Sequence, residues 1–196
     1  MRNTSRSPAV SLFMIGVLVI CATRVCGQES ELVLHYDFSS ESLTAAGTVR
    51  DVSGNGNDGL FVGATLVTRG DGFAARFDRP MSYVECANPG FQSTNAITIA
   101  FWLYMENLPI VWDSFVAREG SYTLSIDRKG WLQFYLTGQR GGEETGVLRP
   151  MGIWRHVALV FDATGEETDL RTYDNGRFLP RRRMDATGAA VDTSIP

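Results

Sequence analysis

Nine residues near the start of the chain have the types and spacing most suited to chemistry. Asp51–Gly59 reads Asp-Val-Ser-Gly-Asn-Gly-Asn-Asp-Gly, with four Asx residues and three glycines. Gly, Asn and Asp tolerate left-handed backbone, and Asx side chains hydrogen-bond to nearby backbone groups. The run therefore predicts an ordered turn, a ligand loop or both. Its carboxylate and amide oxygens are the ligands that Ca²⁺ prefers.

Two known types of ligand-binding loop match part of this pattern, but neither matches the whole of it. Gly54–Gly59 satisfies G-x-G-x-x-G, but dinucleotide binding also needs a helix that begins at the loop, and Leu60–Gly63 looks like a strand. The first half of the loop also matches an EF-hand, whose twelfth position, a bidentate Glu, is Val62 here. A calcium site of another type and a turn closed by its own side chains both remain open.

Catalytic patterns are missing from the sequence. His35 and His156 are the only histidines, and there is no Gly-x-Ser-x-Gly, His-x-x-x-His or cysteine pair in the mature part. Glu143-Glu144 and Glu166–Asp169 lack the spacing that places two carboxylates on one sheet face for glycoside hydrolysis. We therefore predict no enzymatic activity and no catalytic residue.

Aromatic residues favour binding instead. Trp112 lies between Val111 and Asp113 in a predicted loop, so it is the candidate for an exposed ligand platform. The other tryptophans lie in or begin predicted strands, where a core or sheet-surface role is expected.

The N-terminus has the pattern of a secretory signal peptide. Arg2 and Arg6 precede an apolar run, Leu12–Ala22, and Val25-Cys26-Gly27 offers a cleavage point. The run is shorter than the ~20 apolar residues that span a bilayer. The sequence thus predicts a signal peptide over residues 1–27, no stable membrane anchor, and a secreted or extracytoplasmic location.

Charge and cysteine content argue against a nucleic-acid-binding protein and against a protein stabilised by disulfides. The 196-residue chain has a net charge of −4. Without the three arginines of the predicted signal it has 15 basic and 22 acidic residues, a net charge of −7, which disfavours nucleic-acid binding. Cys86 is the one cysteine left after the signal, so no intrachain disulfide is expected, and a small buried residue on a strand is the simplest role.

The mature part consists of short apolar runs with a period of two, separated by turns. Ala96–Met105 and Trp154–Asp162 are the most apolar and are predicted to be central strands. No window shows a helical apolar stripe. The sequence predicts an all-β antiparallel sandwich or jelly roll, with further strands at Leu32–Phe38, Leu60–Val62, Ala64–Val67, Ala74–Phe77, Ser82–Cys86, Ser114–Arg118, Tyr122–Ile126, Trp131–Leu136, Asp169–Tyr173 and Arg177–Leu179.

The connections between these strands differ in kind. Asn175-Gly176 between two short strands is a strong hairpin signal. Gln139–Gly146 is polar and Gly-rich, which predicts an exposed loop, and Arg181–Arg183 is expected to be a solvated loop after the hairpin.

Five motifs occur in a distinctive order: Leu34–Phe38, Asp51–Gly59, Ala96–Trp102, Trp154–Asp162 and Tyr173–Gly176. Together they resemble a laminin-G-like jelly-roll domain of the concanavalin A-like lectin/glucanase superfamily, which implies one such domain over residues 28–196. Members of this family usually continue to a closing strand, which would pair beside Leu32–Phe38. Because the sequence stops at Pro196, the expectation is a C-terminally incomplete domain in which Leu32–Phe38 is a bare edge.

The resemblance also implies a role and a set of site residues. Calcium sites recur in the superfamily, which makes Asp37, Asp51, Asn55 and Asn57 the candidate calcium ligands; the alternative is that they close turns. The implied function is a secreted, non-catalytic module that binds a glycan or an extracellular protein. The alternatives are a structural or adhesion module of a longer exported protein and, third, a glycoside hydrolase-related domain.

Overall fold

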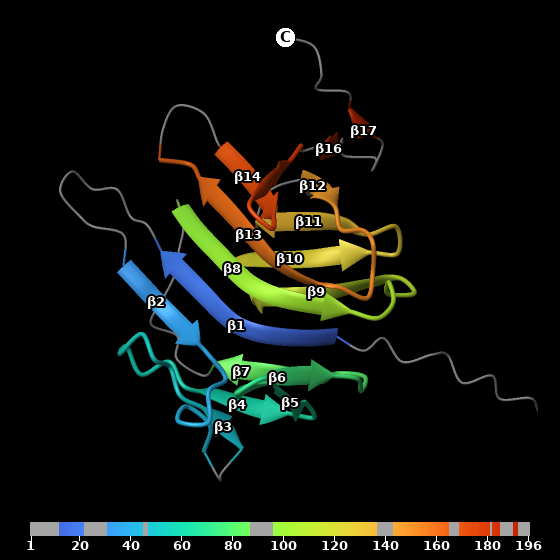
Figure 1. The fold of residues 1–196 in the computed structure, drawn as a ribbon. Coiled ribbons are helices and arrows are strands. Elements are labelled where there is room, and N and C mark those ends of the chain that lie inside the picture. Colours follow the sequence, from blue (N-terminus) through green and yellow to red (C-terminus); the bar gives the residue numbers. More distant parts are fainter. Residues whose placement is uncertain are drawn as a thin grey trace, which may run out of the picture.

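The computed structural model describes residues 12–21, 31–44, 47–86, 96–136, 143–164, 169–180, 182–184 and 190–191. Regular structure in these ranges is β-strand throughout, and neighbouring strands are antiparallel (Figure 1). The described part contains no helix, and hence none that is long and apolar enough to cross a membrane. The predicted all-β antiparallel fold is confirmed.

The described strands form three sheets (Figure 1). The large sheet has the order β15 (Arg177–Leu179), β14 (Asp169–Asp174), β13 (Trp154–Asp162), β8 (Ala96–Met105), β1 (Leu12–Cys21), β6 (Gly72–Phe77) and β5 (Thr65–Arg69), and β2 (Glu31–Tyr36) also pairs with β1. The second sheet has the order β17 (Ala190–Val191), β16 (Arg182–Met184), β12 (Glu143–Val147), β11 (Trp131–Leu136), β10 (Tyr122–Asp127) and β9 (Trp112–Arg118). The small sheet joins β3 (Thr48–Val49), β4 (Gly59–Val62) and β7 (Tyr83–Cys86).

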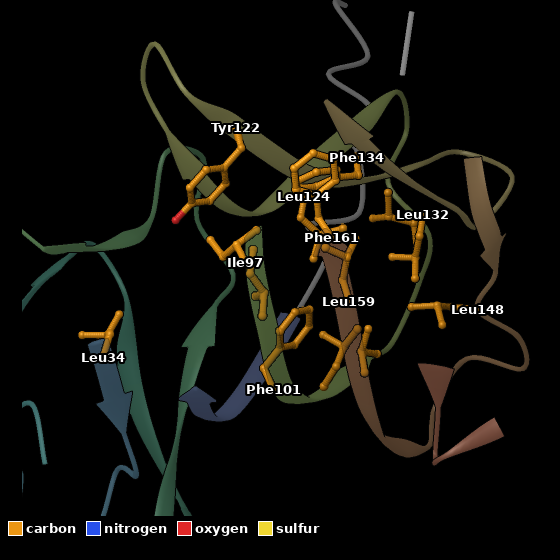
Figure 2. Packing of buried hydrophobic residues seen from close by; sticks show 14 of the residues in the cluster. Leu34, Ile97, Phe101, Tyr122, Leu124, Leu132, Phe134, Leu148, Leu159 and Phe161 are labelled. Carbon is orange, nitrogen blue, oxygen red and sulfur yellow. The ribbon is translucent and has the colours of Figure 1, made fainter. Parts of the chain in front are cut away.

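The core lies between the large and second sheets, as in a sandwich. Burial alternates along β13, and β8 buries most of its length. Figure 2 shows Leu124 and Phe134 of the second sheet pointing toward Leu159 and Phe161 of the large sheet, and the Phe134 and Phe161 ring centroids are 5.5 Å apart. The predicted central strands, Ala96–Met105 and Trp154–Asp162, are confirmed, and they pair from Ala96 to Tyr104 of the first and over the whole of the second.

The predicted Asn-Gly hairpin is also confirmed. β14 pairs with β15 across a turn in which Asn175 has φ 50° and Gly176 has φ 78°. Two successive positive φ angles match the type I′ turn that Asn-Gly favours, because its twist suits the flanking strands.

Two segments predicted to be loops contain strands. Residues 143–147, at the end of the predicted Gln139–Gly146 loop, form β12, which pairs with β11 and β16. Arg182–Met184, in the predicted solvated loop, forms β16; residues 139–142 and 181 lie outside the described ranges. The exposed edge of β11 supplies a pairing partner that no local pattern reveals. Residues 182 and 183 of β16 stand opposite residues 144 and 143 of β12 in the register.

The apolar N-terminal run has an unexpected place in the fold. Leu12–Cys21, predicted to be the core of a signal peptide, forms β1 inside the large sheet. Its residues Val17–Cys21 pair with β2. In the 196-residue chain β1 therefore lies against one edge of β2. The bare edge was predicted for residues 28–196 alone, and it stays a prediction.

A buried ion pair ties β13 to the hairpin. Arg155 is 3% exposed, its Nη1 lies 2.5 Å from Asp174 Oδ2, and its Nη2 donates to the carbonyl of Pro150. A guanidinium this deeply buried needs such partners, because an unpaired buried charge is very costly.

Replacing Arg155 with Met should lower the free energy of unfolding by about 3–5 kcal/mol, because Asp174 would keep its charge without a partner. The control is Arg171→Met on the neighbouring strand. Arg171 pairs with Asp169 at 2.7 Å, but both side chains are about half exposed, so a loss below about 1 kcal/mol is expected. Chemical denaturation of the full-length chain measures both, and equal losses would contradict a special role for the buried pair.

Candidate functional site

The Asx/Gly loop, Asp51–Gly59, lies between β3 and β4 and runs along β2. The Asp51 carboxylate, 4% exposed, organises it. Oδ1 accepts hydrogen bonds from the backbone N–H groups of His35 and Ser53, both at 2.9 Å. Oδ2 accepts from the Ser53 hydroxyl at 2.7 Å and the Asn57 N–H at 3.1 Å. One carboxylate thus fixes three segments of backbone.

The two asparagines attach the loop to the same strand. Asn55 Nδ2 donates to the Leu32 carbonyl and Asn57 Nδ2 to the Val33 carbonyl, both at 2.6 Å. The Val52 N–H donates to the His35 carbonyl at 2.9 Å. The backbone N–H and C=O groups on this edge of β2 therefore find their hydrogen-bond partners in the loop. Most of these partners are side chains, and one is a backbone N–H, so no neighbouring strand is needed.

These contacts also shift the pKa values of Asp51 and Tyr36. Burial alone would raise the pKa of the Asp51 carboxyl, but the hydrogen bonds from Ser53, His35 and Asn57 outweigh burial and hold that pKa below its usual value. Burial raises the pKa of Tyr36, whose hydroxyl donates to the Asn57 carbonyl at 2.6 Å. Asp51 is therefore charged and Tyr36 neutral at ordinary pH.

The predicted calcium ligands are only partly brought together. Asp51, Asn55 and Asn57 lie in one hydrogen-bonded loop, whereas Asp37 accepts a hydrogen bond from the Ser39 N–H at 3.0 Å in the following turn. Asn57 Oδ1 is buried with no hydrogen-bond partner. Across the described residues, no group of three or more His, Cys, Asp and Glu side chains could hold a metal ion. The contacts show the turn-closing role directly, and calcium at the loop stays a prediction.

Trp112, the predicted ligand platform, begins β9 and is 59% exposed. It was expected in a loop, and it pairs instead with Asp127 of β10. Ile110 and Val111 beside it are also more than half exposed. The three form a short apolar surface, which we call the Trp112 patch.

A second aromatic surface was not predicted as a site. It lies on the solvent face of the large sheet, where Trp102 is 42% exposed between the buried Phe101 and Leu103. Trp102 meets His156 edge-on, and Tyr104 lies beside Trp154, with 5.5 Å between ring centroids in each pair. These pairs are register partners on β8 and β13.

A charged side chain completes this surface. The Arg69 guanidinium carbon lies 4.1 Å from the Trp154 ring centroid, a cation–π arrangement. Arg69, Trp154 and Tyr104 line a shallow cavity of about 190 Å³ together with Val67, Thr68 and Ala74. We call Trp102, Tyr104, Trp154, His156 and Arg69 the aromatic surface. The period-two pattern of Ala96–Met105 indicates that Trp102 and Tyr104 share a face of the strand. The sequence does not indicate that the pairing of β8 with β13 places Trp154, and with it Arg69, on the same face.

Comparison with known families agrees with the fold. A laminin G family model, described as concanavalin A-like lectin/glucanases superfamily, matches residues 77–193, more than half of the chain. The chain belongs to this superfamily. No curated protein and no solved structure matches it. The motif order noted in the sequence thus identified the superfamily, while the loop at Asp51 precedes the matched residues.

Replacing Asp51 with Asn should lower the free energy of unfolding by about 1–3 kcal/mol, because the new NH₂ group would face two hydrogen-bond donors in a buried place. The folded-state pKa of Asp51 is lowered, so its contribution is present above the unfolded pKa of about 3.9 and is lost as pH falls through the folded pKa. Denaturation at neutral and acidic pH should show the two proteins converging below about pH 4. Asp58→Asn is the control, because Asp58 Oδ1 accepts one bond, from the Asp51 N–H, that an amide oxygen can also accept. A larger loss of stability for Asp58→Asn than for Asp51→Asn would contradict the central role given to the Asp51 carboxylate.

Thermal melting tests calcium at the same loop. If the predicted oxygens bind Ca²⁺, adding millimolar CaCl₂ to the chelator-treated chain raises Tm, by an amount equivalent to about 2.7 kcal/mol at a hundredfold excess over Kd. The rise should vanish in Asp51→Asn and persist in Asp58→Asn. An unchanged Tm would leave Asp51, Asn55 and Asn57 as turn-closing residues alone.

Proposed function

We propose that this protein is an exported, non-catalytic binding module that binds a glycan on the aromatic surface of the large sheet. The observation that carries the proposal is the grouping of Trp102, Tyr104 and Trp154 beside Arg69 on one solvent-facing surface.

The chemistry of this surface suits sugar rings. A sugar presents a face of C–H groups, which stacks on an aromatic ring, and a rim of hydroxyls, which need hydrogen-bond partners. The exposed Trp102 ring supplies a stacking face with His156 at its side. Arg69, over the Trp154 ring, supplies a polar group to the same surface. The cavity of about 190 Å³ is smaller than the ~300–1,000 Å³ pockets that enclose drug-sized ligands. It therefore favours one ring of a longer chain lying on the surface.

Two observations support a role without catalysis. The described residues that line the cavity include no carboxylate, whereas glycoside hydrolysis needs a pair of them across the scissile bond. The sequence also lacks carboxylates at the spacing used by glucanases. Export is supported by the basic and apolar N-terminal pattern.

The Trp112 patch supports a second candidate function, that of a structural or adhesion module. Ile110, Val111 and Trp112 are 63%, 64% and 59% exposed. Contiguous exposed apolar side chains commonly mark contacts with other proteins.

Binding of the full-length chain to a glycan array, followed by titration of the best ligand, tests these alternatives. Trp102→Ala should weaken binding about tenfold or more, the effect of losing roughly 1.4 kcal/mol of stacking. Trp112→Ala is the matched control and should leave Kd within about twofold of the parent. The opposite result would move the glycan site to the residue that the sequence predicted. No binding to any glycan, with protein partners recovered through Trp112, would favour the adhesion module.

A further inference from the structure

One arginine of the aromatic surface makes no ion pair with a carboxylate of the described residues. Arg69 is exposed, and its guanidinium carbon lies 4.1 Å from the centroid of the Trp154 ring. The ion pairs in the described part of the chain belong to Arg76, Arg155 and Arg171. Because an arginine keeps its charge at any ordinary pH, Arg69 presents a cation on an otherwise aromatic and apolar surface.

A tight hairpin fixes the backbone of Arg69. β5 pairs with β6 over Thr65–Arg69, and Arg69 stands opposite Gly72. The two residues of the turn are Gly70, with φ 54°, and Asp71. Glycine at the first central position is what a type II′ turn requires. The arginine therefore lies at the last position of a paired strand.

The aromatic side of this contact is also fixed. Trp154 begins β13, and the centroid of its ring lies 5.5 Å from that of Tyr104. The next residue, Arg155, is anchored in the core by Asp174 and by the Pro150 carbonyl. Trp154 is thus a firm support for the guanidinium, so Arg69 loses little conformational freedom when a ligand binds.

A stacked guanidinium is suited to a planar anion. Its N–H donors lie in the plane of the group, so stacking occupies one face and leaves the edge for hydrogen bonds. A carboxylate accepts two of these N–H bonds side by side, which adds geometric specificity to the attraction of opposite charges. The described residues that line the cavity include no carboxylate. A carboxylate that enters would therefore meet one cation and no like charge from these residues.

We propose that the glycan bound on the aromatic surface is acidic, and that Arg69 binds the carboxylate of a uronic acid ring in the cavity. This inference rests on the proposed glycan-binding function and names the class of sugar. Trp102, on the same face of β8 as Tyr104, stacks on a neighbouring ring of the same glycan. The whole chain has a net charge of −4, which disfavours general attraction of polyanions. A preference for the acidic sugar must therefore arise at this local contact.

The test compares binding of the full-length chain to polygalacturonate, alginate and glucuronan with binding to the carboxyl-reduced form of each polymer. Reduction converts the carboxylate to a CH₂OH group and keeps the rings and linkages. At least one acidic polymer should bind about tenfold or more tightly than its reduced form.

Variants assign this preference to one side chain. Arg69→Gln should lower the affinity for the acidic polymer to that for the reduced form, whose Kd should stay within about twofold of the parent value. Arg69→Lys keeps the charge without the planar fork and should restore only part of the preference. The control is Arg171→Gln, at an arginine of the same sheet that is about half exposed and pairs with Asp169. It should leave the preference unchanged.

Three results would overturn the proposal. Equal binding of acidic and reduced polymers, or binding of neutral glycans alone, would remove the uronate and leave the glycan-binding function standing. Equally tight, Arg69-dependent binding of dextran sulfate would show a site without preference for a carboxylate. A preference for acid that persists in Arg69→Gln would place the carboxylate elsewhere. Failure to bind any glycan, acidic or neutral, would instead contradict the proposed function itself.

Discussion

Backbone hydrogen bonding on the two edges of β2 is the constraint on which this structure depends. A strand has donors and acceptors on both sides, and burial makes each unpaired group costly. On one side β2 pairs with β1. On the other side the Asp51 carboxylate and the amides of Asn55 and Asn57 take the place of a neighbouring strand. The Asx/Gly loop therefore covers the outer edge of β2, and its residue types follow from that task.

This role explains why the loop looks like a ligand site in the sequence. Oxygen-rich side chains and glycines are needed to bind a cation, and equally to satisfy a strand edge with irregular backbone. In this chain both Asp51 oxygens are engaged by backbone and hydroxyl donors. The composition of the loop alone could not distinguish the two roles, because they use the same chemical groups.

Sequence reasoning succeeded where the signal is local. The alternation in Ala96–Met105 and Trp154–Asp162 gave the central strands, and Asn175-Gly176 gave the hairpin. It failed for β12 and β16, whose strand character comes from pairing with each other and, through β12, with the exposed edge of β11. The aromatic surface was missed for a similar reason. Trp102 and Trp154 are far apart in the sequence, and Arg69 reaches Trp154 only because the large sheet is assembled.

The aromatic surface draws on strands from both sides of β1 in the large sheet. The cavity has Tyr104 and Trp154 on one wall and Val67 and Ala74 on the other. The first pair belongs to β8 and β13 and the second to β5 and β6, which lie on opposite sides of β1 in the strand order. β1 is therefore the strand that joins the two walls of the cavity. A ligand that contacts both walls binds only where the strands on either side of β1 are held in one sheet. By linkage, the binding of such a ligand and the pairing of β1 must each strengthen the other.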